Sequence, residues 1–236
     1  MAIRSRLTQF LLMSLQVTEN GIWLAVWLSV KLATSATLIL LIGGIPIAWW
    51  LSRTRSPIKS VVEALITLPL ILPPTVLGFY LLVVFSPSHV VGGMWQSLFD
   101  STLVFSFYGL LIGSTIYSLP FVVQPIRDGF NKLDHELIDV AETMGANIWQ
   151  KFRYVILPSS KQAIITGCIL GFTHTLGEFG VVLLIGGNIP GETRVLSIAL
   201  YDLIESMQMD TANQVAGGLL GFSFLALFLV SYLQKR

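Results

Sequence analysis

The chain has 236 residues, of which 54% are hydrophobic and only 11% are charged, and its formal net charge is +1. A soluble domain carries about 25% charged residues, so this composition, with a mean hydropathy of +0.76, excludes an ordinary soluble protein. The single cysteine excludes an internal disulfide, and the three scattered histidines lack the spacing of a metal site.

The N-terminal residues 1–21 are predicted to form an interfacial amphipathic segment. Arg4 and Arg6 precede a short apolar patch, Phe10 to Leu15, which loosely resembles a signal peptide. No small-x-small cleavage site follows this patch, so a segment lying at the membrane surface is favoured. Residues 22–236 are predicted to form one transmembrane domain.

Five apolar segments exceed the roughly 18 residues that a spanning helix needs. They are residues 22–51, 60–85, 102–125, 161–187 and 212–233. The sequence therefore predicts an all-α polytopic membrane protein with about five transmembrane helices.

Lysine and arginine placement predicts the orientation. Ten of these residues fall on one side of the five segments, whereas three fall on the other and Lys31 lies inside a span. The ten are Arg53, Arg55, Lys59, Arg127, Lys132, Lys151, Arg153, Lys161, Lys235 and Arg236. Because cytoplasmic loops carry the excess of positive charge, the N-terminus is expected outside and the C-terminus in the cytoplasm.

The second apolar segment is predicted to be a broken helix. It reads TLPLILPPTVLGF and contains Pro69, Pro73 and Pro74. Each proline removes a backbone donor and clashes with the preceding turn. Broken backbone at membrane depth is tolerated only where protein or a water-filled cavity covers it, so Pro73 and Pro74 are candidates for the lining of a pathway.

A long polar stretch, residues 126–160, follows the third segment. Its apolar residues recur at helical spacing to about residue 155, Asp134 can cap the start, and Gly145 interrupts the middle. Pro158 is expected to prevent continuation. The prediction is a short helix, a glycine bend and a second amphipathic helix that enters the membrane.

The fourth apolar segment is rich in glycine. It contains Gly167, Gly171, Gly177 and Gly180, of which the first two are four residues apart and the last two are three apart. Such spacing lets helices approach closely, so the two compatible interpretations are a packing face and the lining of a pathway.

Glu178 is an acid inside this apolar segment. An acid there costs about 2.5–3.5 kcal/mol on insertion scales, so it should be paired, protonated or facing water. One interpretation is a buried partner, such as a backbone donor, a hydroxyl of Thr173 or Thr175, or His174. The alternatives are a residue of a gate or dimer axis, and a proton-coupling group.

The segment ends in a near match to a phosphate-binding loop, Gly186-x4-Gly191-Glu192-Thr193. The functional loop needs a lysine to reach the phosphates, and Glu192 stands in its place. A carboxylate there would repel phosphate, so this chain is not expected to hydrolyse ATP.

The polar stretch carries a family pattern. Asp139-Val140-Ala141-xxx-Gly145, then nine residues and Val155 to Pro158, resembles the coupling loop of ABC importer permeases, Glu-Ala-Ala-xxx-Gly-x9-Ile-x-Leu-Pro. Asp139, Val140 and Val155 depart mildly from this pattern. The resemblance implies that this loop docks on an ATPase subunit. The residues assigned to it are Asp139, Val140, Ala141, Met144, Gly145, Leu157 and Pro158.

Two further stretches, LITLPLILPPTVLGFYLL (65–82) and LGEFGVVLLIGGNIPGET (176–193), occur in the order found in the molybdate permease branch. That branch also handles tungstate and is akin to sulfate permeases. The outer loop that favours molybdate over sulfate contains Asn188, Pro190, Gly191 and Glu192.

The resemblance implies a type I ABC importer permease fold in a bacterial inner membrane. A homodimer would form one central oxyanion pathway, two cytoplasmic ABC ATPase subunits would use the ATP, and an extracytoplasmic molybdate- or tungstate-binding protein would deliver the anion. No cofactor and no nucleic acid is expected on this chain, and it is not itself an enzyme. The residues assigned to the path or gate are Pro73, Pro74, Gly177, Glu178 and Gly180.

Three alternatives remain at this point. A sulfate-type ABC permease differs only in its substrate. An ion-coupled secondary transporter would use Glu178 or Lys31, but the five spans show no inverted repeat. An intramembrane enzyme lacks the paired acids or histidine cluster that it would need.

Overall fold

The computed structural model describes the backbone of residues 2–234 and the side chains of residues 21–134 and 136–233. Within these residues it contains helices and turns only. In chain order the helices are α1 (Ala2–Arg53), α2 (Ile58–Ile71), α3 (Pro74–Phe85), α4 (Val90–Phe99), α5 (Phe107–Asn131), α6 (His135–Thr143), α7 (Ile148–Lys151), the π-helix η1 (Phe152–Ile156), α8 (Leu157–Ser159), α9 (Lys161–Gly177), α10 (Gly180–Gly186), α11 (Leu196–Glu205) and α12 (Met209–Gln234).

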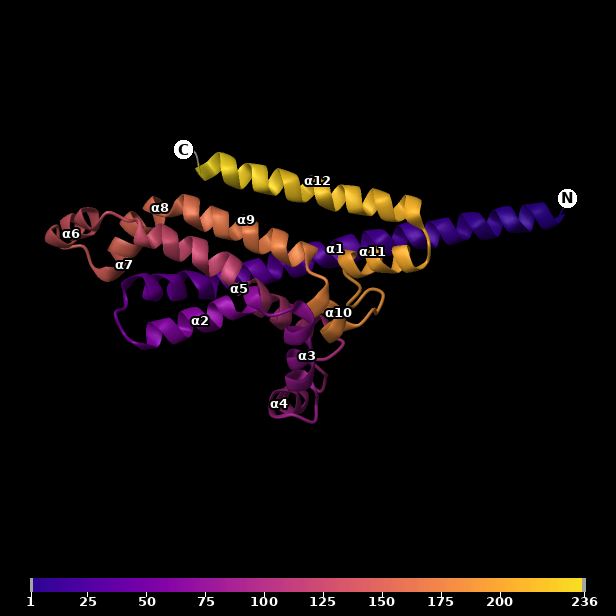
Figure 1. Ribbon diagram of the computed structural model, residues 1–236, viewed down its shortest axis with the longest axis horizontal. Helices are drawn as coiled ribbons and strands as arrows, with labels where there is room; N and C mark the ends of the chain where they lie inside the picture. Colours follow the sequence, from indigo (N-terminus) through magenta and orange to yellow (C-terminus); the bar gives the residue numbers. More distant parts are fainter. Residues whose placement is uncertain (1, 235–236) are drawn as a thin grey trace.

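The helices α1, α2, α5, α9 and α12 run along the long axis of the molecule, whereas α3 leaves this bundle and carries α4 to one side (Figure 1). The helices α6 to α8 and the C-terminal end of α12 lie at one end of the long axis. The N-terminal end of α1 lies at the other (Figure 1). The two termini are therefore at opposite ends, as the predicted orientation requires, although the membrane sidedness itself stays a prediction.

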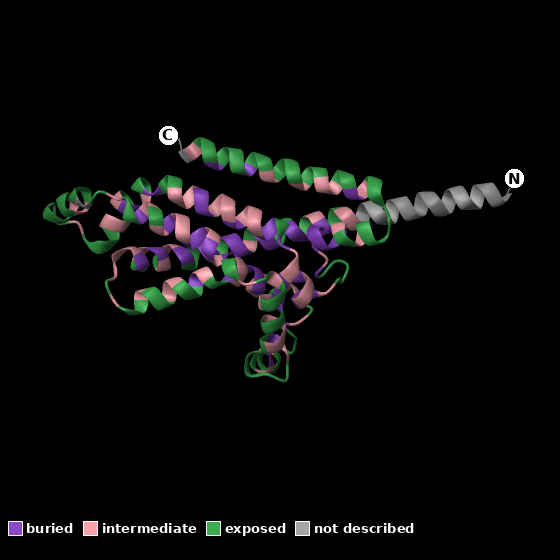
Figure 2. Ribbon diagram, in the orientation of Figure 1, coloured by how far each residue is buried: buried purple, intermediate pink, exposed green. Residues whose placement is uncertain are grey.

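The core lies where α1, α5 and α9 meet (Figure 2). Its largest cluster of buried apolar side chains includes Leu40, Leu51, Val122, Ile126 and Phe130. By contrast, only 11% of the apolar window of α12 is buried within the chain. A helix that is apolar all round and unburied within its own chain is suited to face lipid or another membrane helix.

Among the residues that the structure describes, three unbroken helices are long and apolar enough to cross a membrane, and two bent pairs bring the possible number of spans to five. The unbroken stretches are Gly21–Arg53, Phe107–Asn131 and Met209–Leu233. The bent pairs are α2 with α3, at 113°, and Ile148–Ser159 with α9, at 70°. The predicted interfacial segment, residues 1–21, lies almost wholly where the structure describes no side chains, so that assignment stays a prediction.

The predicted break in the second apolar segment is confirmed. The last hydrogen bond of α2 runs from the Leu72 amide to the Leu68 carbonyl, at 3.1 Å. Pro73 and Pro74 follow and have no amide hydrogen to donate, so the helical ladder stops there. Pro73 adopts extended backbone, Pro74 begins α3, and Pro69 stays inside α2.

The expectation that Pro158 stops the second cytoplasmic helix is wrong by a few residues, because helical backbone continues to Ser159. The turn before the proline is a π-helix, in which the Leu157 amide donates to the carbonyl of Phe152. The wider turn alters the carbonyl positions that a proline in an α-helix would clash with. The chain then bends at Ser160 into α9.

Two glycines of α9 are confirmed as packing residues. A Cβ added to Gly171 would lie 2.4 Å from Val122 Cγ2, and one added to Gly167 would lie 2.9 Å from the Val122 carbonyl oxygen. Real Cβ atoms do not approach so closely, so the backbone of α9 packs directly against the side chain and the backbone of Val122 on α5. Gly177 has no atom within 4 Å of an added Cβ, so packing does not explain it.

We expect Gly171→Leu to lower the thermal stability of the purified permease, because overpacking a tight contact costs about 1–3 kcal/mol. The matched control is Gly217→Leu in α12, where an added Cβ meets nothing within 4 Å. Thermal unfolding in detergent measures both. Equal midpoints for the two variants would contradict the tight α5–α9 contact.

Candidate functional site

The two broken apolar segments meet. A Cβ added to Gly180, the first residue of α10, would lie 2.7 Å from Pro74 Cβ, and one added to Gly78 of α3 would lie 3.2 Å from the Val181 Cα. The α2–α3 break and the α9–α10 break are therefore packed against each other. We call this place the break junction.

A cavity of about 510 Å³ opens at the break junction. Its lining residues are Pro74, Thr75, Tyr117, His174, Gly177, Glu178, Phe179, Gly180, Leu183 and Leu184. Four of the five pathway residues assigned from the sequence are among them, and the fifth, Pro73, adjoins Pro74. The structure thus brings together residues that lie about a hundred positions apart in the chain.

Glu178 lies between α9 and α10 and is 5% exposed. Its carboxylate accepts hydrogen bonds from the amides of Val181 (2.6 Å) and Val182 (3.0 Å). Its own carbonyl accepts a hydrogen bond from the Ser197 hydroxyl, at 2.6 Å. A carboxylate at a helix start satisfies amides that have no partner within the helix. The interpretation of Glu178 as an acid with a buried backbone partner is confirmed, and neither nearby threonine nor His174 is that partner.

Polar residues on α5 and α9 complete the junction. From the sequence, His174 and Thr175 were considered only as partners of Glu178, and Tyr117 and Ser118 were missed. The Ser118 hydroxyl oxygen lies 2.9 Å from His174 Nδ1 and 2.8 Å from the Thr175 hydroxyl oxygen. The His174 ring stacks on Phe121 with ring centroids 3.8 Å apart. Tyr117 lies one helical turn before Phe121 on α5, with its ring centroid 4.9 Å from that of His174, and it lines the cavity. The signal available in the sequence was a set of polar residues inside apolar segments, since these usually face the protein interior.

The predicted coupling loop has the expected helix–bend–helix form. The Asp134 side chain accepts a hydrogen bond from the Glu136 amide and so caps α6. Gly145 adopts a φ of +80°, in the left-handed region that favours glycine, and ends this helix. Asn147 and Gln150 form a reciprocal capping box that begins α7.

An ion pair fixes the two sides of this bend. Lys151 Nζ donates to Glu142 Oε2 at 2.8 Å. This bond lowers the pKa of the Glu142 carboxyl below its usual range, so the carboxyl is ionised at neutral pH. The bend is therefore held by a hydrogen bond as well as by the backbone of Gly145.

The loop presents an unusually apolar surface. The large exposed apolar side chains on it are Leu137, Val140, Met144, Ile148 and Trp149, which we call the coupling surface. Met144 and Ile148 are both 82% exposed. Of the other assigned residues, Asp139 is exposed, Ala141 is half-buried, and Leu157 and Pro158 lie at the bend into α9. Exposed apolar groups gathered in this way mark an interaction site.

The outer loop between α10 and α11 is tightly hydrogen-bonded. The amides of Glu192, Thr193 and Arg194 all donate to the Ile189 carbonyl, at 3.0–3.2 Å. The Thr193 hydroxyl donates to the Gly186 carbonyl at 2.7 Å. These bonds fold the near P-loop into a closed turn rather than an open cradle for phosphate, which agrees with the rejection of that motif.

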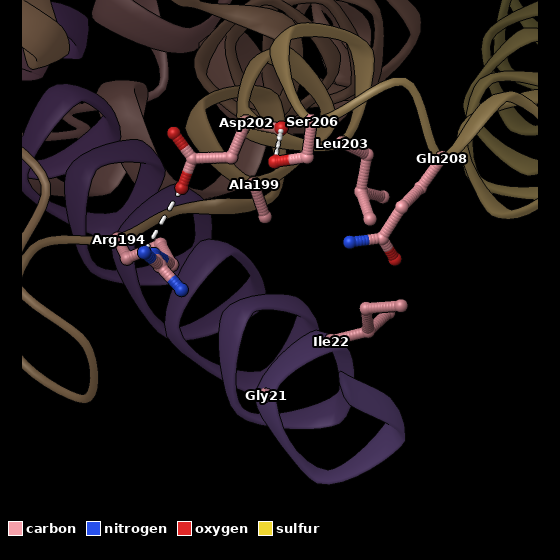
Figure 3. A pocket seen from close by; sticks show the side chains of 8 residues that line it. All are labelled: Gly21, Ile22, Arg194, Ala199, Asp202, Leu203, Ser206 and Gln208. Carbon is pink, nitrogen blue, oxygen red and sulfur yellow. Dashed lines mark hydrogen bonds and ion pairs between the residues drawn. The ribbon is translucent and has the colours of Figure 1, made fainter. Parts of the chain in front are cut away.

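Charged groups tie this loop to α11. Arg194 pairs with Asp202 at 2.9 Å and donates from Nε to the Asn188 side-chain oxygen at 2.6 Å. Asn188 in turn donates to both oxygens of Asp202, at 2.7 and 2.8 Å. Figure 3 shows the Arg194–Asp202 pair at the edge of a pocket of about 270 Å³ beside α1. Of the assigned loop residues, Asn188 therefore anchors the loop, whereas Pro190, Gly191 and Glu192 form its exposed tip.

Comparison with known proteins gave consistent matches. Residues 41–236 match the family described as binding-protein-dependent transport system inner membrane component. The chain is 49% identical over 204 residues to the molybdenum transport system permease protein ModB of Azotobacter vinelandii, covering 86% of this chain and 90% of that protein. It is 36% identical over 193 residues to the sulfate transport system permease protein CysT of Escherichia coli K12, covering 82% and 69%.

The fold matches a solved structure as well. A bacterial ABC transporter that imports the acidic polysaccharide alginate superposes with a TM-score of 0.68, at 19% identity, over 91% of this chain and 78% of the matched one. At this identity the likeness concerns the fold alone.

We expect Glu178→Ala to destabilise the permease, because it leaves two buried amides without an acceptor, at about 1–3 kcal/mol for each such group. Glu178→Gln keeps one side-chain oxygen and should lie between wild type and the alanine variant. Thermal unfolding of purified protein ranks the three. A glutamine variant as unstable as the alanine variant would contradict the capping role. Uptake lost from fully folded Glu178→Gln would instead support a role in the gate.

Proposed function

Because the chain belongs to the family of binding-protein-dependent transport system inner membrane components, we propose that two copies of it form the membrane pathway of a molybdate importer. The observation that carries the pathway assignment is the break junction, where two interrupted helices meet at a cavity. Broken backbone at membrane depth is tolerated where protein or a water-filled cavity covers it. At the break junction, polar side chains also line the cavity beside the broken backbone.

The chain is the permease subunit of an ABC importer, a multi-pass protein of the bacterial inner membrane. Hydrolysis of ATP belongs to a partner ATPase subunit, and the family depends on a binding protein. Family membership overturns two of the alternatives weighed above, the ion-coupled secondary transporter and the intramembrane enzyme. The sulfate-type permease remains as the second candidate.

Molybdate is the proposed substrate, with tungstate as its close chemical analogue. The 49% identity to a molybdenum permease extends over most of both chains. The match to the sulfate permease has a lower identity, 36%, and covers a smaller share of that protein, 69%. An extracytoplasmic molybdate- or tungstate-binding protein would supply the tight binding, so the permease need only let the anion pass.

The break junction suits passage of a dianion. Among the described residues of its lining, Glu178 carries the one carboxylate, and two amide hydrogens engage it and offset its negative charge. Thr75, Tyr117 and His174 add side chains that can donate hydrogen bonds to an oxyanion. In a homodimer the same cavity would occur twice, once in each copy, beside a shared path.

The coupling surface is the proposed docking site for the ATPase subunit. Its exposed apolar side chains need a partner, and α6 joins the membrane domain through α7, η1 and α8. From there α9 runs directly to Glu178 at the break junction. A movement of α6 on ATP binding would therefore reach the junction through helices that follow one another in the chain.

The substrate assignment is tested by uptake in a strain that lacks its own molybdate and sulfate importers. The complete transporter, with its ATPase and binding protein, should restore molybdate and tungstate accumulation, measured by elemental mass spectrometry. Sulfate accumulation should stay at the background of the strain. Restored sulfate uptake without molybdate uptake would favour the sulfate-type permease instead.

We expect Gly145→Val to weaken co-purification of the ATPase subunit, because a β-branched residue at a φ of +80° strains the bend by about 1–3 kcal/mol. Gly145→Asn should be tolerated much better, since asparagine enters the left-handed region. An added Cβ at Gly145 meets nothing within 4 Å, so the pair isolates the backbone effect. Equal recovery of ATPase with both variants would contradict a role for this bend.

A further inference from the structure

Another cavity lies away from the break junction. It has a volume of about 290 Å³ and is bounded by α1, the turn before α5 and the tip of the outer loop. Lys31 supplies its positive charge, Ser101 and Tyr108 supply hydroxyls, and Glu192 supplies a carboxylate. None of these residues belongs to the site described above, except that Glu192 is part of the outer loop.

Lys31 is held in place without an ion pair. Its Nζ lies 4.4 Å from the centroid of the Phe107 ring, a cation–π contact. Among the side chains that the structure describes, no carboxylate lies within 4.0 Å of this ammonium group. The ring contact orients the ammonium group but accepts no conventional hydrogen bond, so its three N–H donors remain available to a ligand.

The hydroxyls of the cavity can donate as well. Ser101 Oγ accepts a hydrogen bond from Trp95 Nε1 at 3.2 Å, which leaves its own hydrogen free to donate. Tyr108 is exposed and lines the same space. One ammonium and two hydroxyls around a small cavity match the acceptor oxygens of a tetrahedral oxyanion.

The opposite wall is fixed. Gly191 and Glu192 stand at the tip of the outer loop, whose three amide bonds to Ile189 hold its shape. The Glu192 carboxylate would repel an anion in the cavity. Removal of the two charges therefore has opposite expected effects, which distinguishes an anion site from a merely structural pair.

We propose that this cavity receives a tetrahedral oxyanion at the end of the permease remote from the coupling surface, with Lys31 as the residue that contacts it. The proposal deepens the proposed function and rests on it: the anion would bind here after release from the binding protein and before it reaches the break junction. A phospholipid phosphate has the same chemistry, and the test separates these two sources.

The test measures binding of tungstate to the purified permease–ATPase complex in lipid nanodiscs, without binding protein, by equilibrium dialysis and elemental mass spectrometry. Lys31→Met should weaken binding about tenfold, because the charge-assisted contact is lost, and Lys31→Arg should keep most of it. Glu192→Gln should strengthen binding several-fold as repulsion is removed. Lys59→Met, in the first turn of α2, is the control and should bind as wild type does.

Three outcomes would overturn the inference. One is tungstate binding that does not change in Lys31→Met, and a second is weaker binding in Glu192→Gln. The third is a tightly held anionic phospholipid, found by native mass spectrometry in wild type and lost in Lys31→Met, with no tungstate bound to either. Uptake by the wild-type transporter is measured in parallel. If uptake persists and tungstate binding is unchanged in Lys31→Met, only this inference is refuted. If the wild-type transporter takes up no oxyanion, the proposed function is refuted as well.

Discussion

The constraint on which the structure depends is that backbone groups inside a membrane need partners within the protein. Two apolar segments of this chain are interrupted, one by consecutive prolines and one at Glu178. Each interruption exposes backbone groups that lipid cannot satisfy. The fold meets this constraint by packing the two interruptions against each other and by using the Glu178 carboxylate for two of the exposed amides.

The same arrangement links the ends of the molecule. The glycines of α9 bring it against α5, so that Gly167 and Gly171 leave no room for a side chain between these helices. Arg127 of α5 pairs with Glu63 of α2 at 3.2 Å, and this ion pair joins the first broken segment to the packed helices α5 and α9. Close-packed interiors transmit strain and rearrange between discrete packings rather than deforming continuously. A shift at the coupling surface would therefore be passed on to the break junction.

Local features of the fold could be predicted from the sequence because each has a local cause. Pro73 and Pro74 lack amide hydrogens, Asp134 can cap a helix, and Gly145 has the freedom that a left-handed bend needs. Contacts between distant segments could not be predicted in this way. Nothing in the sequence placed Gly180 against Pro74, and nothing indicated which of several candidate partners Glu178 would use. The π-helix before Pro158 was also missed, since proline alone predicts only that a regular α-helix is disturbed there.

The distribution of charge bears on how an anion could pass. Among the residues described, the lining of the break junction contains neither lysine nor arginine, and its one carboxylate is engaged by amides. A junction of this kind offers hydrogen bonds without a strong attractive charge, so a dianion could enter it without being trapped. Conduction requires such weak binding, because a site that binds too tightly also releases slowly. The attractive charge of Lys31 lies instead in a separate cavity beside the outer loop. Attraction and passage are thereby assigned to different places, which lets an incoming anion be concentrated without obstructing the junction.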